Sequence, residues 1–264
     1  MARIQLIEII DQSWCPKVVR DGITDFLQFL LGWRNFYSPA AHLLGNALDQ
    51  AGAERVVDLC SGAGGPWLHL VHALKENRQR VVQVRLTDRY PNIDAFKRIE
   101  KASAGAIRFE SQSIDPTAVP SGIGDFRTIF SSFHHFPPSQ AKTVIHDAVR
   151  NRQGIAIFEF THRSFLAIML YCFIPFIVMA FAPFIRPFRW SRLFLTYLIP
   201  VLPWLTWFDG TVSCFRTYSP SELRGMVREH EHEGYVWQIG EVSNGPSPFP
   251  VTYLIGYPER AQAG

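Results

Sequence analysis

Cysteine is scarce in this sequence, and so are the patterns that give cysteine a function. Only four cysteines occur among the 264 residues, and no two of them form a CxxC pair. No histidine cluster lies near any of them, which argues against a zinc-binding motif and against a disulfide framework. The sequence therefore predicts a protein of a reducing compartment without a metal site. The cysteines are Cys15, Cys60, Cys172 and Cys214.

Long runs of like charge are also missing. Lys and Arg total 26 against 23 Asp and Glu, and the formal net charge is +3. Without a basic stretch, the sequence lacks the electrostatic footprint of a nucleic-acid-binding protein. The first 14 residues lack the basic start and the longer apolar core of a signal peptide. We therefore expect no nucleic-acid partner and a location on the cytoplasmic side.

Hydrophobic residues are plentiful, at 47% of the chain. A chain of this length can bury one substantial core but is too short for two ordinary domains and a linker. From residue 54 onward, short apolar runs alternate with intervals long enough for a helix or loop, which predicts an α/β fold with a doubly wound, mostly parallel sheet. The expected parallel strands are 54–59, 81–87, 106–110, 127–131 and 154–160.

The two ends of the chain and one late segment complete the predicted architecture. Helical spacing of apolar residues in 11–50 predicts two or three helices before the first strand. Residues 235–242 and 251–257, joined by a proline-rich turn, predict an antiparallel hairpin at the edge of a seven-stranded sheet. The expected organisation is a helical lid in 1–50, a core in 51–163 and 213–260, and a hydrophobic helical insertion in 164–212.

The segment VVDLCSGAGGPW carries the first chemical signal. A strand ends at Asp58, and Gly62 and Gly64 allow the backbone to approach a ligand that faces the free amides of the next helix. A dinucleotide-binding fingerprint requires a third glycine three positions after the second, and this position is Trp67. The geometry therefore argues against a nicotinamide cofactor.

These residues resemble motif I of the class I S-adenosylmethionine-dependent methyltransferases, an acid followed by glycines at alternating positions. The resemblance covers roughly residues 40–160 and 215–258, and the chain departs from the motif at Cys60, where the first glycine usually stands. It implies a Rossmann-like methyltransferase fold and S-adenosylmethionine as the cofactor, and the chain departs from a plain methyltransferase most in a hydrophobic insertion after the fifth strand.

The resemblance also implies where that cofactor would lie. Asp58 would lie under its amino acid moiety, and Asp88, at the tip of the second strand, would bind the ribose hydroxyls. Ser113 or Asp115 would face the adenine, and the choice between them stays open. With the turn, a tyrosine of the lid and a serine after the fourth strand, the predicted contacts are Tyr37, Asp58, Cys60, Ser61, Gly62, Gly64, Asp88, Ser113, Asp115 and Ser131.

Candidate catalytic residues follow the fourth strand, in TIFSSFHHFPP. Methyl transfer requires alignment, exclusion of water and, for some acceptors, removal of a proton. His134 and His135 lie where ligands bind in such sheets, and a histidine with a pKa near about 6.5 suits proton transfer. The alternative is that the pair is structural and holds the loop by hydrogen bonds. Glu159, at the end of the fifth strand, is the further candidate.

The insertion is unusually apolar. Residues 165–185 form a run of about 21 residues without a charge, close to the roughly 20 that span a bilayer as a helix. Residues 193–208 are fewer and include two prolines, and three arginines lie between the two runs, against the positive-inside tendency for a crossing hairpin. We expect a hairpin lying in one leaflet. The alternatives are a spanning hairpin and a soluble cap over the acceptor site or a dimer interface.

Together these features predict methyl transfer to an apolar or lipid-like small molecule at a membrane surface. Two alternatives stay open: a non-catalytic, membrane-bound interaction module on a degenerate methyltransferase fold, and an NAD(P)-dependent reductase. Cofactor affinity would separate them. The acceptor atom and the oligomeric state are not encoded in any motif of the sequence.

Overall fold

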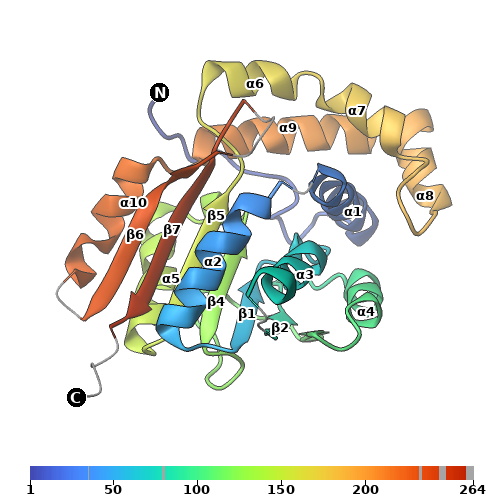
Figure 1. The fold of residues 1–264 in the computed structure, drawn as a ribbon. Coiled ribbons are helices and arrows are strands. Elements are labelled where there is room, and N and C mark those ends of the chain that lie inside the picture. The colour runs from blue at the N-terminus through green and yellow to red at the C-terminus, as the bar shows by residue number, and fades with distance from the viewer. Residues whose placement is uncertain (35, 79–80, 232–233, 244–247, 260–264) are drawn as a thin grey trace.

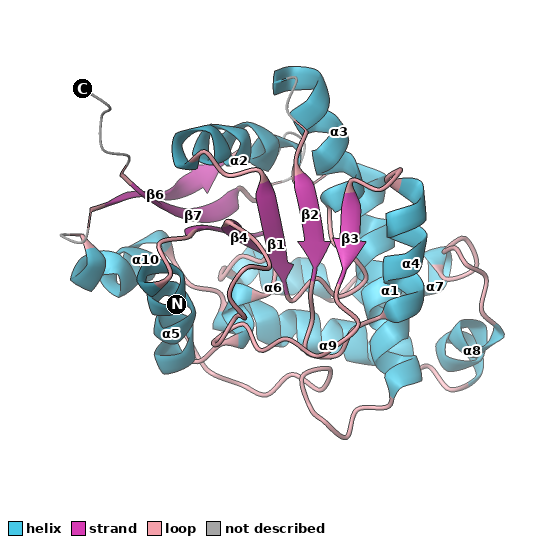
Figure 2. Ribbon diagram, turned by 90° about the horizontal axis from the view of Figure 1, so that it is seen from below, coloured by secondary structure: helices cyan, strands magenta, loops and turns pink. Residues whose placement is uncertain are grey.

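The architecture is a seven-stranded sheet with helices on both faces (Figures 1 and 2). The computed structural model describes residues 1–34, 36–78, 81–231, 234–243 and 248–259. The strand order is β3-β2-β1-β4-β5-β7-β6, and β7 runs antiparallel to both β5 and β6. This confirms the predicted doubly wound fold with its C-terminal hairpin. The strands are β1 Arg55–Leu59, β2 Gln83–Leu86, β3 Ile107–Phe109, β4 Phe126–Phe130, β5 Gly154–Glu159, β6 Tyr235–Val242 and β7 Val251–Pro258.

The strands at the centre of the sheet are apolar because helices cover both of its faces. Every residue of β4 and β5 is buried, as expected for parallel strands covered on both faces. The chain order reverses between β1 and β4, and the carboxyl ends of the strands at such a reversal leave a crevice for ligands. Four residues of the predicted hairpin turn, 244–247, lie outside the described part of the chain.

Two hydrophobic cores cover the two faces of the sheet. Helices α2 (Ser38–Ala51), α3 (Trp67–Arg78) and α4 (Ile93–Ala102) contribute to one core. Helices α5 (Pro138–Arg150) and α10 (Pro220–Val227) contribute to the other. The predicted lid is therefore smaller than 1–50, because α2 buries Leu44 and Leu48 against the sheet as an ordinary covering helix. Only the segment before it, with α1 (Lys17–Arg34), lies over the crevice.

The insertion is a bundle of short helices at the end of the sheet toward which the arrowheads of β1 to β3 point (Figure 2). Its helices α6 and α7 run alongside α9, and α8 lies at the far end (Figure 1). A third apolar cluster joins this bundle to α1 through Ile23, Phe26 and Leu202. The elements are α6 Phe165–Tyr171, α7 Ile174–Phe181, α8 Trp190–Leu193, the π-helical turn η2 Phe194–Leu198, and α9 Val201–Arg216.

The apolar run 165–185 is not one continuous helix. The chain turns at Cys172 and Phe173, and Pro175 occupies the first turn of α7, where its missing N–H leaves no intrahelical bond unmade. Among the described helices, none is long and apolar enough to cross a membrane alone. The segments Trp190–Leu198 and Val201–Arg216, bent by 79° to each other, meet the length and composition of a span only as a pair.

Candidate functional site

A cavity of about 630 Å³ lies at the carboxyl ends of the parallel strands. Its wall combines the glycine turn after β1, the end of β2, the loops after β3 and β4, the N-terminal segment and α1. The cavity therefore lies in the crevice that the strand order predicts. The predicted site residues that line it are Cys60, Ser61, Gly62, Asp88, Asp115, Ser131 and His135.

The glycine turn and the acid after β2 are in direct contact. The backbone N–H of Gly62, whose φ is +57°, donates to Oδ2 of Asp88 at 2.7 Å. The other carboxylate oxygen accepts from the N–H of Tyr90 at 2.8 Å. Burial raises the pKa of Asp88, although both hydrogen bonds oppose this effect. The arrangement confirms that turn and carboxylate lie side by side.

Two other residues of the motif support the turn from behind the cavity wall. Asp58 is buried and accepts hydrogen bonds from the hydroxyls of Ser61 and Thr128, each at 2.6 Å, and burial raises its pKa to about 6. Gly64 has φ +103°, and a Cβ there would lie 1.9 Å from Cδ1 of Ile99. The structure therefore corrects the prediction that these two residues face the ligand: one braces the turn, and the other permits close packing on α4.

Cys60 lines the cavity in a strained conformation. Its φ is +57°, in the left-handed region that side chains disfavour by roughly 1–2 kcal/mol. The departure from the motif thus falls at a position whose backbone favours glycine. Burial also raises the pKa of its thiol, so this cysteine does not present a reactive thiolate.

Tyr37, which the sequence predicts to contact a cofactor, does not line the cavity. Its ring is fully buried in the core, because it directly precedes the sheet-covering helix α2. Its hydroxyl forms a hydrogen bond with the side chain of Ser131, which lines the cavity and has φ +47°. Tyr37 therefore positions Ser131 and does not reach the cavity itself.

The two candidates in the loop after β3, Ser113 and Asp115, differ in where their side chains lie. Asp115 lines the cavity, and its Oδ1 accepts from the N–H and the hydroxyl of Thr117 at 2.9 and 2.7 Å. The hydroxyl of Ser113 instead donates to the carbonyl of Arg89 at 2.9 Å, at an exposed position outside the wall. Asp115 is the one that faces the cavity.

His134 and Glu159 form a buried pair that holds the loop after β4. Nδ1 of His134 lies 2.7 Å from Oε2 of Glu159. The other carboxylate oxygen of Glu159 accepts the N–H groups of Phe133 and His134 at 2.6 and 3.2 Å. Burial alone would raise the pKa of Glu159, but the neighbouring histidine holds it below its usual value. Neither side chain lines the cavity, so the structure favours the structural alternative for both.

His135 does line the cavity, between two carboxylates. Its Nδ1 lies 2.9 Å from the carboxylate of Asp11 and 3.1 Å from Oε2 of Glu8. Burial lowers the pKa of His135, but the charges of Asp11 and Glu8 outweigh this effect and raise the pKa to about 9. In this arrangement the imidazole carries a proton at neutral pH, which opposes the predicted role as a base.

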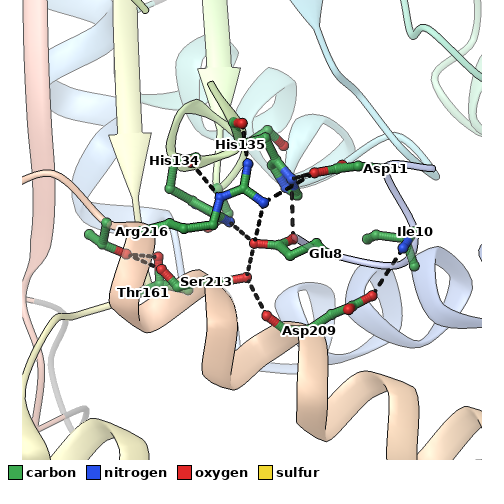
Figure 3. A network of polar contacts seen from close by, with 12 residues as sticks. Glu8, Ile10, Asp11, His134, His135, Thr161, Asp209, Ser213 and Arg216 are labelled. Carbon is green, nitrogen blue, oxygen red and sulfur yellow. Dashed lines mark hydrogen bonds and ion pairs between the residues drawn. The ribbon is translucent and has the colours of Figure 1, made fainter. Parts of the chain in front are cut away.

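A polar network that sequence reasoning missed surrounds the two histidines (Figure 3). Arg216 on α9 lies 3.4 Å from Oε1 of Glu8 and 3.3 Å from Asp11. Asp209, which precedes Arg216 on the same helix α9, accepts the N–H groups of Ile9 and Ile10 at 2.8 and 3.1 Å. These residues come from two ends of the chain and belong to no motif, so only their coordinates reveal the cluster.

The described part of the insertion does not border the cavity, which argues against the alternative of a cap over the acceptor site. Among the described residues, none of 164–212 lies in its wall, because α1 stands between the wall and the insert. Asp25 of α1 faces the insert and not the cavity. Its carboxylate lies 2.8 Å from Arg192 and 3.3 Å from Arg98.

Comparisons with known proteins agree with the fold. No protein-family model and no curated protein matches the sequence. An O-methyltransferase family protein from Burkholderia thailandensis superposes with a TM-score of 0.52 at 18% identity, over 92% of this chain and 60% of that one. Human N-acetylserotonin methyltransferase in complex with S-adenosylmethionine gives 0.49 at 13%, over 89% and 56%. This chain has a Rossmann-like methyltransferase fold and spans about three fifths of the length of the Burkholderia structure.

Proposed function

We propose that this protein transfers a methyl group from S-adenosylmethionine to an apolar small molecule. The observation that carries the proposal is the contact between the N–H of Gly62 and the carboxylate of Asp88 at the cavity wall. In nucleotide-binding α/β folds, an acid at the end of the second strand binds the ribose hydroxyls beside the glycine turn. The methyltransferase fold of the chain supports the choice of cofactor.

The described residues fit this cofactor. Its ribose would lie at Asp88, its adenine toward Asp115, and its amino acid portion near the backbone of Ser61 and Gly62. When bound, it supplies an electrophilic methyl group. A volume of about 630 Å³ falls within the range of small-molecule sites, roughly 300–1,000 Å³.

The other side of the cavity fits an apolar acceptor. Leu27 and Leu31 of α1 and Leu6, Ile7 and Ile10 of the N-terminal segment contribute side chains to the wall. The N-terminal segment is tied down by the bonds from Ile9 and Ile10 to Asp209, so it would exclude water from the reacting groups. Apolar walls favour an acceptor with little charge over most of its surface.

A titration with S-adenosylhomocysteine tests the cofactor. We expect the wild type to bind, and Asp88→Ala to bind at least about tenfold more weakly, because hydrogen bonds to a charged group contribute roughly 1.5–3 kcal/mol. Asp94→Ala, an exposed acid in the first turn of α4, is the control and should bind like the wild type. Equal affinity of Asp88→Ala contradicts the proposal. Absence of binding to wild type favours the non-catalytic alternative, and binding of NAD instead favours the reductase.

The insert supports a second part of the proposal, attachment to the surface of a lipid bilayer. Its outer surface exposes a set of large apolar side chains that we call the apolar face. Large exposed apolar residues in such number mark interaction sites, and aromatic residues near arginine suit the bilayer interface. The face comprises Phe165, Leu166, Met169, Leu170, Phe173, Phe176, Met179, Phe184, Phe188, Trp190, Phe194, Tyr197, Leu198, Ile199, Trp204 and Phe208.

Flotation with vesicles of phosphatidylcholine and phosphatidylserine tests the attachment. We expect the wild type to float and a triple variant, Phe176→Glu, Trp190→Glu and Leu198→Glu, to stay in the bottom fraction. All three residues are exposed, so the variant should still fold and bind S-adenosylhomocysteine. The control is Val81→Glu, an equally exposed apolar residue outside the insert. A wild type that does not float, but is a dimer that the triple variant separates, would identify the apolar face as a contact between two copies.

A further inference from the structure

The side chains of Glu8, His134 and His135 converge on one point beside the cavity (Figure 3). One ligand atom from each lies within 4.8 Å of the others. Glu8 and His134 are buried, and His135 is partly exposed at the cavity wall. Two imidazoles and a carboxylate are a donor set that divalent ions such as Zn²⁺ and Co²⁺ accept.

His134 provides an independent sign of a missing ligand. Its Nε2 is buried, and it has no hydrogen-bond partner among the described residues. Because Nδ1 lies 2.7 Å from Glu159, the ring presents Nε2 toward Oε1 of Glu8, at 3.7 Å. That separation is too long for a hydrogen bond, and a metal ion between the two atoms would give both of them a partner.

The carboxylate behind His134 fits the same interpretation. A histidine that binds a metal through one ring nitrogen usually donates its other ring N–H to a carboxylate or a carbonyl, which fixes the orientation of the ring. Glu159 takes this position, and its other oxygen is fixed by the backbone N–H of Phe133. The ring of His134 is thus held so that Nε2 points toward Glu8.

The charges of the cluster leave room for a divalent cation. Three carboxylates, those of Glu8, Asp11 and Glu159, surround the two imidazoles, and Arg216 is the guanidinium that contacts them. Arg216 balances one of the three negative charges, and the proton that His135 carries in the metal-free structure balances a second. Asp209 adds a further carboxyl group beside Ile9 and Ile10. A divalent cation that displaces the proton from His135 would balance the two charges that Arg216 leaves.

We propose that Glu8, His134 and His135 bind a divalent transition-metal ion. The sequence pointed to no metal site because Glu8 lies far from the histidines along the chain. Since Glu8, Asp11 and His135 line the cavity, an open coordination position would face it. A role for the ion in orienting an acceptor oxygen rests on the proposed methyl transfer, whereas binding of the ion does not.

Binding of Co²⁺ and Zn²⁺ to the full chain, after removal of metals with a chelator, tests the site. We expect one equivalent to bind, with Co²⁺ giving the visible absorption of a low-symmetry nitrogen and oxygen site that Zn²⁺ abolishes by competition. Glu8→Gln keeps an acceptor for Ser213 but loses the anionic ligand, and should weaken binding at least about tenfold. Asp125→Asn is the control, because it changes an exposed carboxylate outside the cluster, and should bind like the wild type.

A second variant and a parallel measurement keep the outcome decisive. If Glu8→Gln does not fold, His135→Asn, at the partly exposed ligand, decides the question in the same way. Failure of the wild type to bind Co²⁺, or equal binding by the folded ligand variants, would overturn the proposal. Titrating S-adenosylhomocysteine in the same samples separates the metal site from the proposed methyl transfer. Metal binding without cofactor binding would contradict only the proposed methyl transfer.

Discussion

Cys60 combines a functional position with an unfavourable backbone conformation. It lines the cavity two residues before Gly62, the glycine of the turn that contacts Asp88, and its φ is +57°. Strain of this kind is retained where the surrounding structure fixes the backbone. Here the fixed element is the turn, which is held by Ser61 donating to Asp58 and by the N–H of Ser61 donating to the carbonyl of Thr87 at 2.9 Å.

Replacing Cys60 measures this strain. Cys60→Gly and Cys60→Ala both remove the thiol, but only glycine relieves the left-handed conformation, so the glycine variant should be more stable than the alanine variant by about 1 kcal/mol. Urea denaturation of the two variants gives the difference directly. Equal stability would show that the position has no backbone strain. Since the turn keeps its shape, both variants should retain S-adenosylhomocysteine binding.

At the residue scale, sequence reasoning located the cofactor side of the candidate site better than the acceptor side. The turn and Asp88 were predictable because strand ends in a parallel sheet meet at one edge. The roles of Tyr37 and Gly64 were misassigned, since a motif does not show whether a residue faces the ligand or packs behind it. Glu8 and Arg216 could not be predicted, because only tertiary folding brings them to His135.

At the scale of elements, the insert is joined to the rest of the molecule by charge as well as by apolar packing. Asp25 of α1 and Arg192 of α8 are both buried, and Nη2 of Arg192 lies 2.8 Å from Oδ2 of the carboxylate. The same guanidinium donates to the carbonyls of Ile185 and Pro187, at the loop between α7 and α8. This pair therefore connects the wall of the cavity to the part of the insert that carries the apolar face.

Breaking this pair should destabilise the protein strongly. In Asp25→Asn the buried guanidinium of Arg192 loses its counter-charge, and removal of one partner of a buried ion pair costs roughly 3–5 kcal/mol. Arg98, which lies 3.3 Å from Asp25, is more exposed to water, so the loss of its contact with Asp25 costs less free energy. Asp125→Asn, which breaks the exposed pair with Arg55, is the control and should leave the stability almost unchanged, because solvent screens this pair. Denaturant midpoints that shift equally in the two variants would refute the linkage.

The helices of the insert also show what the hydrophobic pattern of the sequence cannot predict. An apolar run without charges predicts burial or lipid contact, but it does not reveal that the chain turns at Cys172 and Phe173 between two short helices. In the structure α7 packs against α9, and the segment that ends with η2 is bent by 79° to α9. The sequence indicated an apolar hairpin, and the packing of its helices determines that it rests on α1 and not on the cavity.

At the scale of the whole molecule, the alternation of strands and helices was enough to predict the sheet, because each element buries a face that its sequence marks as apolar. The fold also places carboxyl groups where water is excluded. Burial raises the pKa of Asp58 and of Asp209 to about 6 each. Both groups therefore couple the stability of the entire fold to pH.

The sign of that coupling follows from the direction of the shift. Burial raises the pKa of Asp58 from 3.8 to about 6, so the folded protein holds this proton more tightly than the unfolded chain. The resulting stabilisation is fully present below about pH 4 and is lost as the pH rises through about 6, by roughly 3 kcal/mol. Asp209 contributes a slope of the same sign in this interval, so Asp58→Asn should remove only part of the decline.

Urea denaturation of the metal-free protein at several pH values between about 4 and 7 measures this slope. A matched variant acts in the opposite direction. Ser61→Ala deletes a hydrogen bond that lowers the pKa of Asp58, so the free energy of unfolding of this variant should continue to fall at higher pH than that of the wild type. If Asp58→Asn and the wild type lose the same free energy of unfolding over this interval, Asp58 is ionised in the fold. The turn beside Asp88 would then rest on a buried negative charge, and its geometry would need a counter-charge from a ligand to be stable.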